Sequence, residues 1–216
     1  MTSMPKVFVT RKIPGDHIER LRESGYEVEV SEFDRALTPE ELLEKVPDID
    51  GLLCLLTDRI DEDLMDAAGP QLRVISNYAV GFDNIDVEGA TKRGIVVCNT
   101  PSEVVNEAVA EHTWALILAL SRRIVEADEV IRRGAYKGWE PDIFLGISLL
   151  GKTLGIIGLG RIGTMVARRA KGFNMNVIYN KKTPDPKIEK ELDVKFSNLN
   201  SLLAFSDVVT LHVPLT

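Results

Sequence analysis

Hydrophobic positions in the first part of the chain form short continuous apolar runs, separated by segments in which they recur at helical spacing. The runs predict strands at residues 7–10, 26–30, 52–56, 72–76 and 95–98, and the helical segments between them are 16–24, 38–46, 61–69 and 86–93. Thr38 before Pro39 and two glutamates is a typical helix start. Apolar strands that alternate with helices predict an α/β fold, with a parallel sheet covered on both faces.

This alternation breaks at residues 99–102, where we predict a boundary between a domain of residues 1–100 and a domain of residues 101–216. A long helical segment, 103–121, follows, and it is apolar on more than one side. Such a helix fits either a dimer contact or an internal helix packed on its own sheet. The remaining elements are predicted as a helix at 124–133, an irregular connection at 134–151, strands at 154–157, 175–179, 194–196 and 207–212, and helices at 164–172, 185–192 and 198–205.

A glycine-rich turn lies between the strand at 154–157 and the next helix. Taken alone, such a turn is only a turn, but a G-x-G-x-x-G motif after a strand and before a helix is the dinucleotide-binding fingerprint. Gly158 permits the tight turn, Gly160 lets a pyrophosphate approach the backbone, and Gly163 lets the helix pack closely on the strand. The predicted pyrophosphate site consists of Gly158, Leu159, Gly160, Arg161, Ile162 and Gly163.

The end of the second strand of this unit indicates which dinucleotide binds. An NAD site has an acidic residue about 20 residues after the glycines, on the ribose 2′-hydroxyl. Here the chain continues as Asn180, Lys181, Lys182 and Thr183, without an acid. Because lysines attract a 2′-phosphate and a carboxylate repels it, we predict a preference for NADP(H), with NAD(H) possible. The alternative is that both lysines are solvated turn residues.

Composition places the chain among ordinary soluble globular proteins, with 44% hydrophobic and 27% charged residues. A net charge of −7 argues against general nucleic-acid binding, which needs a basic face. The longest apolar stretch, 114–120, is too short to span a bilayer. Cys54 and Cys98 lie in apolar runs and are predicted to be buried free thiols, so a cytoplasmic location is the default. No cluster of residues has metal-ligand spacing.

Three stretches together resemble the D-2-hydroxyacid dehydrogenase family, and within it the archaeal-type glyoxylate reductases. They are the loop NYAVGFDNID at residues 77–86, the boundary NTP at 99–101, and the glycine turn with the later HVPLT at 212–216. The resemblance covers residues 6–216. It implies a flavodoxin-like substrate domain with a Rossmann domain inserted into its sequence, and an active site in the cleft between them. It also implies a homodimer formed through the Rossmann domain.

By this resemblance, the chain is similar to enzymes that use NAD(P)H to reduce a small 2-oxo acid, such as glyoxylate or hydroxypyruvate. Val80 and Gly81 would offer backbone N–H groups to the substrate carboxylate, while Val213 and Pro214 would line the nicotinamide side. The alternative at Gly81 is a turn that needs glycine for its backbone angle. Asp83 and Asn84 are expected to cap the following helix and hold the loop.

The resemblance also assigns no catalytic residue to this chain. In the family, the arginine that orients the 2-oxo acid and the glutamate–histidine pair that delivers the proton lie beyond the part that this chain matches. His17, His112 and His212 are expected to be structural. We therefore expect the N-terminal part of a longer reductase, with a Rossmann sheet ordered 3-2-1-4 that lacks its last two strands and with little activity by itself. The alternatives are an inactive dinucleotide-binding fragment and a binding module like the dinucleotide-dependent co-repressors.

Overall fold

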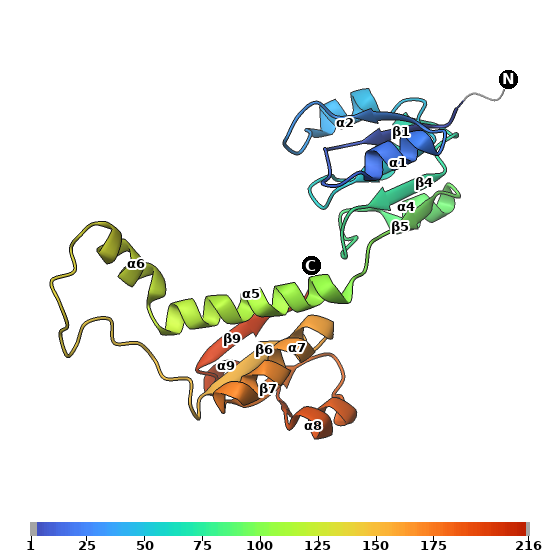
Figure 1. Ribbon diagram of the computed structural model, residues 1–216. Coiled ribbons are helices and arrows are strands. Elements are labelled where there is room, and N and C mark those ends of the chain that lie inside the picture. The colour runs from blue at the N-terminus through green and yellow to red at the C-terminus, as the bar shows by residue number, and fades with distance from the viewer. Residues whose placement is uncertain (1–3, 215–216) are drawn as a thin grey trace. The chain divides into compact units, whose positions relative to one another are not determined.

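The computed structural model describes residues 4–214, and the chain divides into two compact units between Ser102 and Glu103. The first unit is a parallel sheet of five strands in the order β2-β1-β3-β4-β5 (Figure 1). Its elements are β1 (Lys6–Val9), α1 (His17–Glu23), β2 (Glu27–Val30), α2 (Pro39–Lys45), β3 (Gly51–Cys54), α3 (Glu62–Ala68), β4 (Val74–Asn77), α4 (Val87–Lys92) and β5 (Val96–Cys98). This order is that of the flavodoxin-like fold. The predicted α/β class with a parallel sheet is confirmed.

Local sequence explains where the helices begin. At α2, the Thr38 side chain accepts from Glu41 N and the Glu41 carboxylate accepts from Thr38 N, which is a complete capping box. Asp61 caps α3 by a single contact, in which its side chain accepts from Leu64 N. These caps satisfy backbone donors that would otherwise be unpaired at the helix ends.

The core of the first unit lies against its central strands, where Phe8, Leu52 and Ile75 are buried. The two edge strands, β2 and β5, differ from the predictions of apolar strands and of two buried cysteines. β2 alternates exposed glutamates with half-buried valines, so it is not apolar on both faces, because an edge strand has a side open to water. Cys54 is buried as predicted, but Cys98 is exposed, because it ends the edge strand β5.

The second unit contains a parallel sheet of four strands in the order β8-β7-β6-β9. Its elements are α5 (Glu103–Ser121), α6 (Ile124–Arg132), β6 (Thr153–Ile157), α7 (Arg161–Ala170), a 3-10 turn (Lys171–Phe173), β7 (Asn176–Asn180), α8 (Pro186–Leu192), β8 (Lys195–Phe196), α9 (Leu199–Phe205) and β9 (Val208–Leu211). Counted from the glycine turn, the order is the 3-2-1-4 of a Rossmann sheet. The helix after the glycine turn begins at Arg161, three residues earlier than predicted.

One face of α5 packs inside the second unit. Trp114 on this helix is buried, donates from Nε1 to Val166 O at 3.1 Å, and stacks on Phe173. A second side of α5 carries exposed apolar side chains, with Leu116 53% and Leu120 80% exposed. The internal packing that we predicted as an alternative is therefore present, and it leaves a second apolar face uncovered.

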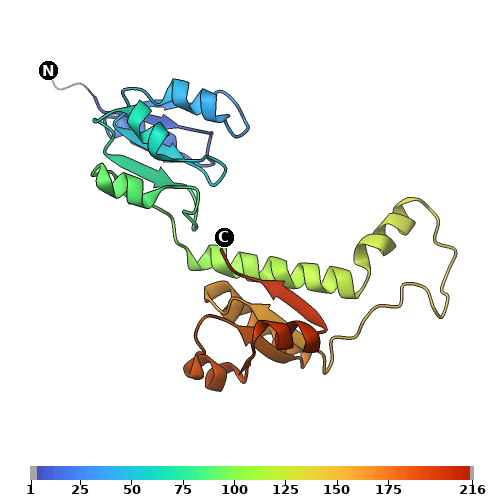
Figure 2. The ribbon, with the colours of Figure 1, turned by 180° about the vertical axis from the view of Figure 1, so that it is seen from behind.

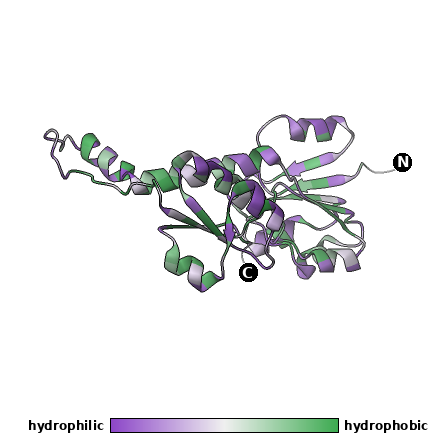
Figure 3. Cartoon of the chain, turned by 90° about the horizontal axis from the view of Figure 1, so that it is seen from below, coloured by the Kyte–Doolittle hydropathy of each residue, from purple (hydrophilic) through white to green (hydrophobic). Residues whose placement is uncertain are grey.

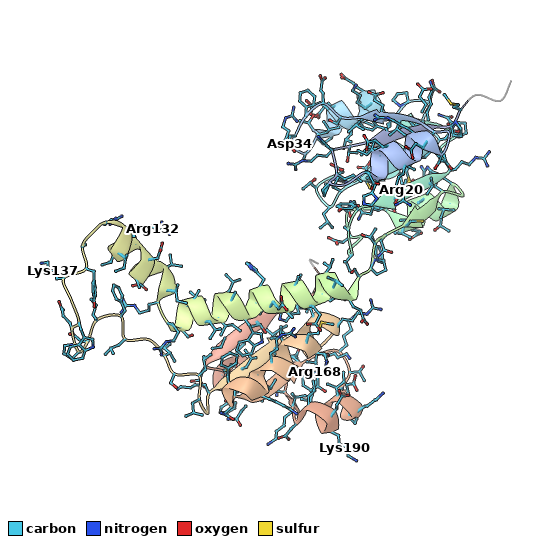
Figure 4. The ribbon with its side chains drawn as sticks, viewed as in Figure 1. Arg20, Asp34, Arg132, Lys137, Arg168 and Lys190 are labelled. Carbon is cyan, nitrogen blue, oxygen red and sulfur yellow. The ribbon has the colours of Figure 1, made fainter. Side chains whose placement is uncertain are left out.

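The segment after α5 extends away from the sheet of its own unit (Figures 1 and 2). α6 has no buried residue, and its surface shows several hydrophobic positions (Figure 3). Residues 134–151 form no helix or strand, as predicted, and Arg132 and Lys137 mark the far end of this segment (Figure 4). Among residues 4–214, no helix has the length and apolar character that crossing a membrane would require.

Candidate functional site

The glycine turn of the second unit connects β6 to α7. Gly158 has a φ of +97°, a conformation that favours glycine, and its N–H donates to Asn180 O at 2.9 Å. A Cβ on Gly158 would lie 2.3 Å from His212 O, and one on Gly163 would lie 2.3 Å from Gly158 O. Both glycines therefore allow close contacts that the fold itself requires.

Gly160 differs from these two glycines. A Cβ built on it meets no atom within 4 Å, and its φ of −90° is open to any residue. The packing of the protein therefore does not require glycine at this position. A ligand lying directly against the backbone would require it, so this open cradle fits a pyrophosphate.

The N-terminus of α7 is equipped for an anion. The first intrahelical bond runs from Thr164 N to Gly160 O, and among residues 4–214 the N–H groups of Arg161, Ile162 and Gly163 have no acceptor. The first turn carries no acidic side chain, and the N-cap glycine has no side chain to occupy these donors. Free N–H groups and the positive end of the helix dipole attract phosphate. Leu159 is buried in the core of the unit.

The end of β7 carries the two predicted lysines, and an acidic residue, Asp185, lies beside one of them. Lys181 Nζ lies 3.4 Å from Asp185 Oδ2, whereas Lys182 and Thr183 are exposed. Hydrogen bonding from Ile188 N, and then from Lys181, holds the pKa of Asp185 below its ordinary value. Sequence reasoning missed this acid, because it follows the strand by five residues and also serves as the N-cap of α8.

Two further contacts hold the end of β7. The Asn180 side chain donates to Ser197 O at 2.9 Å, and it thereby ties β7 to the end of the neighbouring strand β8. The buried Tyr179 hydroxyl accepts from Asp185 N at 2.8 Å, which fixes the loop that carries the lysines.

The chain after β9 returns to the glycine turn. His212 N donates to Ile157 O at 2.8 Å, and burial lowers the pKa of its imidazole. His212 is half-buried, whereas His17 and His112 are exposed. Val213 and Pro214 follow and are exposed, while Leu215 and Thr216 of the HVPLT motif lie outside the described residues.

The carboxylate turn, residues 79–82 of the first unit, is the segment predicted to bind the substrate carboxylate. Hydrogen bonds to its carbonyl groups hold it in place. Donors at the ends of β4 and β5 contact the carbonyl oxygens of three successive residues. Thr100 N donates to Ala79 O at 2.8 Å, Asn99 Nδ2 donates to Val80 O at 2.8 Å, and Asn77 Nδ2 donates to Gly81 O at 2.9 Å. Sequence reasoning missed the roles of these donors, although two asparagines directly after apolar runs were a signal that could have been used.

This arrangement decides where the N–H groups of the turn point. In a trans peptide the N–H is directed opposite to the C=O, and the chain has no cis peptide among its described residues. The N–H groups of Val80, Gly81 and Phe82 therefore face away from the donors that hold their carbonyls, and no acceptor within residues 4–214 pairs with them. Three adjacent N–H groups without an acceptor are donors that a carboxylate could use.

Two alternatives for this loop can now be settled. Gly81 does not have a positive φ, so a special backbone angle is not the reason for glycine there. Asn84 holds the loop as expected, donating to Leu55 O and Asp58 O at 3.0 and 2.9 Å. The predicted cap by Asp83 or Asn84 is wrong, because Asp86 caps α4 by accepting from Gly89 N at 2.8 Å.

Comparison with known proteins agrees with these features. The family model for the catalytic domain of D-isomer specific 2-hydroxyacid dehydrogenase matches residues 7–210. The chain belongs to this family. It is 50% identical over 216 residues to a glyoxylate reductase from Thermococcus onnurineus (strain NA1), an alignment that covers 98% of this chain and 64% of that relative.

Solved structures of similar proteins show the same fold. The TT0316 protein from Thermus thermophilus is 46% identical with a TM-score of 0.87, and the match covers 98% of this chain and 65% of that one. A D-lactate dehydrogenase from Aquifex aeolicus, complexed with NAD and lactic acid, is 29% identical with a TM-score of 0.81, covering 98% and 61%. The chain thus spans less than two thirds of the length of these relatives. Within residues 4–214, no three or more histidine, cysteine, aspartate or glutamate side chains gather in a way that could hold a metal ion.

Proposed function

We propose that this chain contributes to the NAD(P)H-dependent reduction of a small 2-oxo acid, such as glyoxylate or hydroxypyruvate, to the 2-hydroxy acid. The observation that carries the proposal is the set of free N–H groups at Val80, Gly81 and Phe82, in a member of the 2-hydroxyacid dehydrogenase family. The Thermococcus relative is named a glyoxylate reductase, and the Aquifex neighbour is complexed with lactic acid. Both names point to a small acid with an oxygen on the carbon next to the carboxylate.

Each unit would supply one part of the binding. The N–H groups of Val80 and Gly81 bind the substrate carboxylate and so orient the neighbouring 2-oxo carbon. The N-terminus of α7 holds the pyrophosphate against Gly160, and Val213 and Pro214 line the nicotinamide side. When bound, the reduced dinucleotide supplies the hydride. The arginine and the glutamate–histidine pair expected from the resemblance would belong to the part of the relatives that this chain does not match.

The same proposal includes a preference for NADP(H). It is supported by Lys181 and Lys182 at the end of β7, where no acid occupies the strand end itself. Titration of the 216-residue chain with NADPH and with NADH, followed by nucleotide fluorescence, tests it. We expect tighter binding of NADPH, with the difference reduced at high ionic strength. Equal or tighter binding of NADH would contradict the preference.

Amide spectra test the carboxylate site directly. In ¹⁵N–¹H correlation spectra of the chain, glyoxylate should shift the amide signals of Val80, Gly81 and Phe82, and sodium chloride at the same ionic strength should not. Unchanged signals at these three positions would refute the proposed site. Turnover of NADPH with glyoxylate then separates a reductase from an inactive dinucleotide binder or a co-repressor-like module.

We also propose that the chain forms a homodimer through the second unit. The support is the uncovered apolar face of α5 and its continuation on α6, where Val125 is 72% and Ile131 59% exposed. Exposed apolar surface of this extent on neighbouring elements is typical of interaction sites.

A further inference from the structure

A buried hydrogen-bonded network lies behind the carboxylate turn. Asp58 is 2% exposed, and its Oδ2 accepts from Thr10 Oγ1 at 2.5 Å and from Leu55 N at 2.8 Å. No lysine, arginine or histidine within residues 4–214 forms an ion pair with this carboxylate. Burying a carboxylate without a cationic partner costs folding free energy, and the two hydrogen bonds to Asp58 offset part of that cost.

The network continues from Asp58 to the turn. The Leu55 and Asp58 carbonyls both accept from Asn84 Nδ2, so the short loop after β3 fixes the orientation of the Asn84 amide. Asn84 Oδ1 then accepts from Asn77 Nδ2 at 2.9 Å, and the same Nδ2 donates to Gly81 O at 2.9 Å.

The buried thiol of Cys54 completes the orientation of Asn77. Burial raises the pKa of Cys54 to about 12, so the thiol stays protonated and its Sγ donates to Asn77 Oδ1 at 3.4 Å. With its oxygen engaged there, the fully buried Asn77 amide directs its nitrogen to Gly81 O. The amide therefore cannot flip without losing four hydrogen bonds.

We propose that Asp58 and Thr10 are positioning residues for carboxylate recognition, acting through Asn84 and Asn77 on the Val80–Phe82 turn. This inference rests on the proposed function. The network joins the ends of β1, β3 and β4 to the peptide unit whose N–H belongs to Phe82. It fixes the Gly81–Phe82 peptide of the turn before any ligand arrives, so binding does not have to order that peptide.

Paired variants at Thr10 separate positioning from packing. Thr10→Val keeps the volume and removes the hydroxyl donor, whereas Thr10→Ser keeps the hydroxyl and removes a methyl group. If the hydroxyl matters, Thr10→Val should raise the glyoxylate dissociation constant about tenfold, and Thr10→Ser should stay near wild type. A packing role gives the reverse order, because serine leaves a cavity and valine does not.

Asp58→Asn supplies the second test, with Asp50→Asn as its control. Asp50 also accepts a backbone N–H, from Lys6, but at the opposite end of the sheet. Dissociation constants come from glyoxylate shifts of the Val80, Gly81 and Phe82 amides. We expect Asp58→Asn to weaken glyoxylate binding about tenfold with NADPH binding unchanged, and Asp50→Asn to change neither.

The outcomes separate this inference from the proposed function. Glyoxylate binding to wild type at these amides, with unchanged affinity in Thr10→Val and Asp58→Asn, would overturn the positioning role alone. Absence of glyoxylate shifts in the wild-type protein would overturn the carboxylate site and the inference together. If Thr10→Val unfolds, the other two variants decide: the positioning role requires near-wild-type glyoxylate binding in Thr10→Ser and about tenfold weaker binding in Asp58→Asn.

Discussion

Gly160 is a residue whose identity the fold does not explain, because a side chain there would point into open space. We expect Gly160→Ala to lower the free energy of unfolding by about 1 kcal/mol at most, because alanine is a poorer N-cap residue than glycine. The same change should weaken dinucleotide binding about tenfold or more, by keeping the pyrophosphate away from the backbone. Urea unfolding and nucleotide titration measure the two effects.

Two other glycines, one in the glycine turn and one after α7, provide the controls for this prediction. Gly158→Ala should destabilise the protein severely, because it combines a φ of +97° with a Cβ only 2.3 Å from His212 O. Gly172→Ala has open space as Gly160 does, lies at the other end of the helix, and should leave nucleotide affinity unchanged. Wild-type affinity in Gly160→Ala would contradict the assigned approach of the pyrophosphate.

The two lysines at the end of β7 should not be equivalent. Lys181 is paired with Asp185, whereas Lys182 has no ion pair within residues 4–214. We expect Lys182→Ala to lower NADPH affinity about tenfold at low salt and to leave NADH affinity unchanged, because only NADPH carries the 2′-phosphate. Lys181→Ala should have a smaller effect. Equal losses for both nucleotides would show that the lysines do not read the 2′-phosphate.

His212 should make stability depend on pH near neutrality. Burial lowers its pKa in the folded state, so the unfolded chain binds the proton more readily. The stability from this group is therefore present above about pH 6.5, the unfolded value, and is lost as the pH falls through the lowered folded pKa. Between about pH 7 and pH 5, the free energy of unfolding should fall less in His212→Gln than in wild type.

At the scale of an element, α7 combines a structural and a binding role in one helix. Its buried side, with Val166, Ala167 and Ala170, packs against the sheet and α5, while its N-terminus presents free N–H groups. An acid in the first turn should affect these two roles in opposite directions. We expect Arg161→Glu to stabilise the helix slightly, by about 0.3–1 kcal/mol, and to weaken both NADPH and NADH binding about tenfold, through repulsion of the pyrophosphate.

The last turn of the same helix provides a matched control. Arg168 lies there, on the surface of α7 (Figure 4), and Arg168→Glu should lower stability slightly without changing nucleotide affinity. Thermal unfolding and fluorescence titration report both quantities for each variant. If Arg161→Glu and Arg168→Glu weakened nucleotide binding equally, general charge rather than the helix terminus would be responsible.

At the scale of the whole molecule, the uncovered face of α5 should determine the oligomeric state. Leu120 is 80% exposed, so Leu120→Glu should not destabilise the unit itself. We expect the variant to sediment as a monomer at concentrations where wild type is a dimer, because a charge opposes burial of this apolar face. Phe205→Glu, at a 72% exposed site on α9, is the control and should leave the dimer intact. A wild-type chain that sediments as a monomer would refute the proposed interface.

Much of this architecture was readable from the amino-acid order. Strand and helix positions follow from periodicity and caps, which depend on residues only a few positions apart, and the glycine turn was recognisable from its place between β6 and α7. Predicted element ends differ from those observed by up to three residues, as at the start of α7. Such ends depend on hydrogen bonds that the local sequence specifies weakly.

Local patterns could not show which residues hold the carboxylate turn. Asn99 and Val80 are 19 positions apart, and Thr10 and Asp58 are 48 apart, yet each pair is joined by a hydrogen bond. These contacts exist because parallel pairing brings the ends of β1, β3, β4 and β5 to one edge of the sheet. Strand order likewise determined the exposure of the two cysteines. Cys98 ends the edge strand β5 and is exposed, whereas Cys54 ends the internal strand β3 and is buried. Amino-acid order specified the strands and the turn, and the packing of distant strands decided which polar groups meet there, because only the folded sheet makes them neighbours.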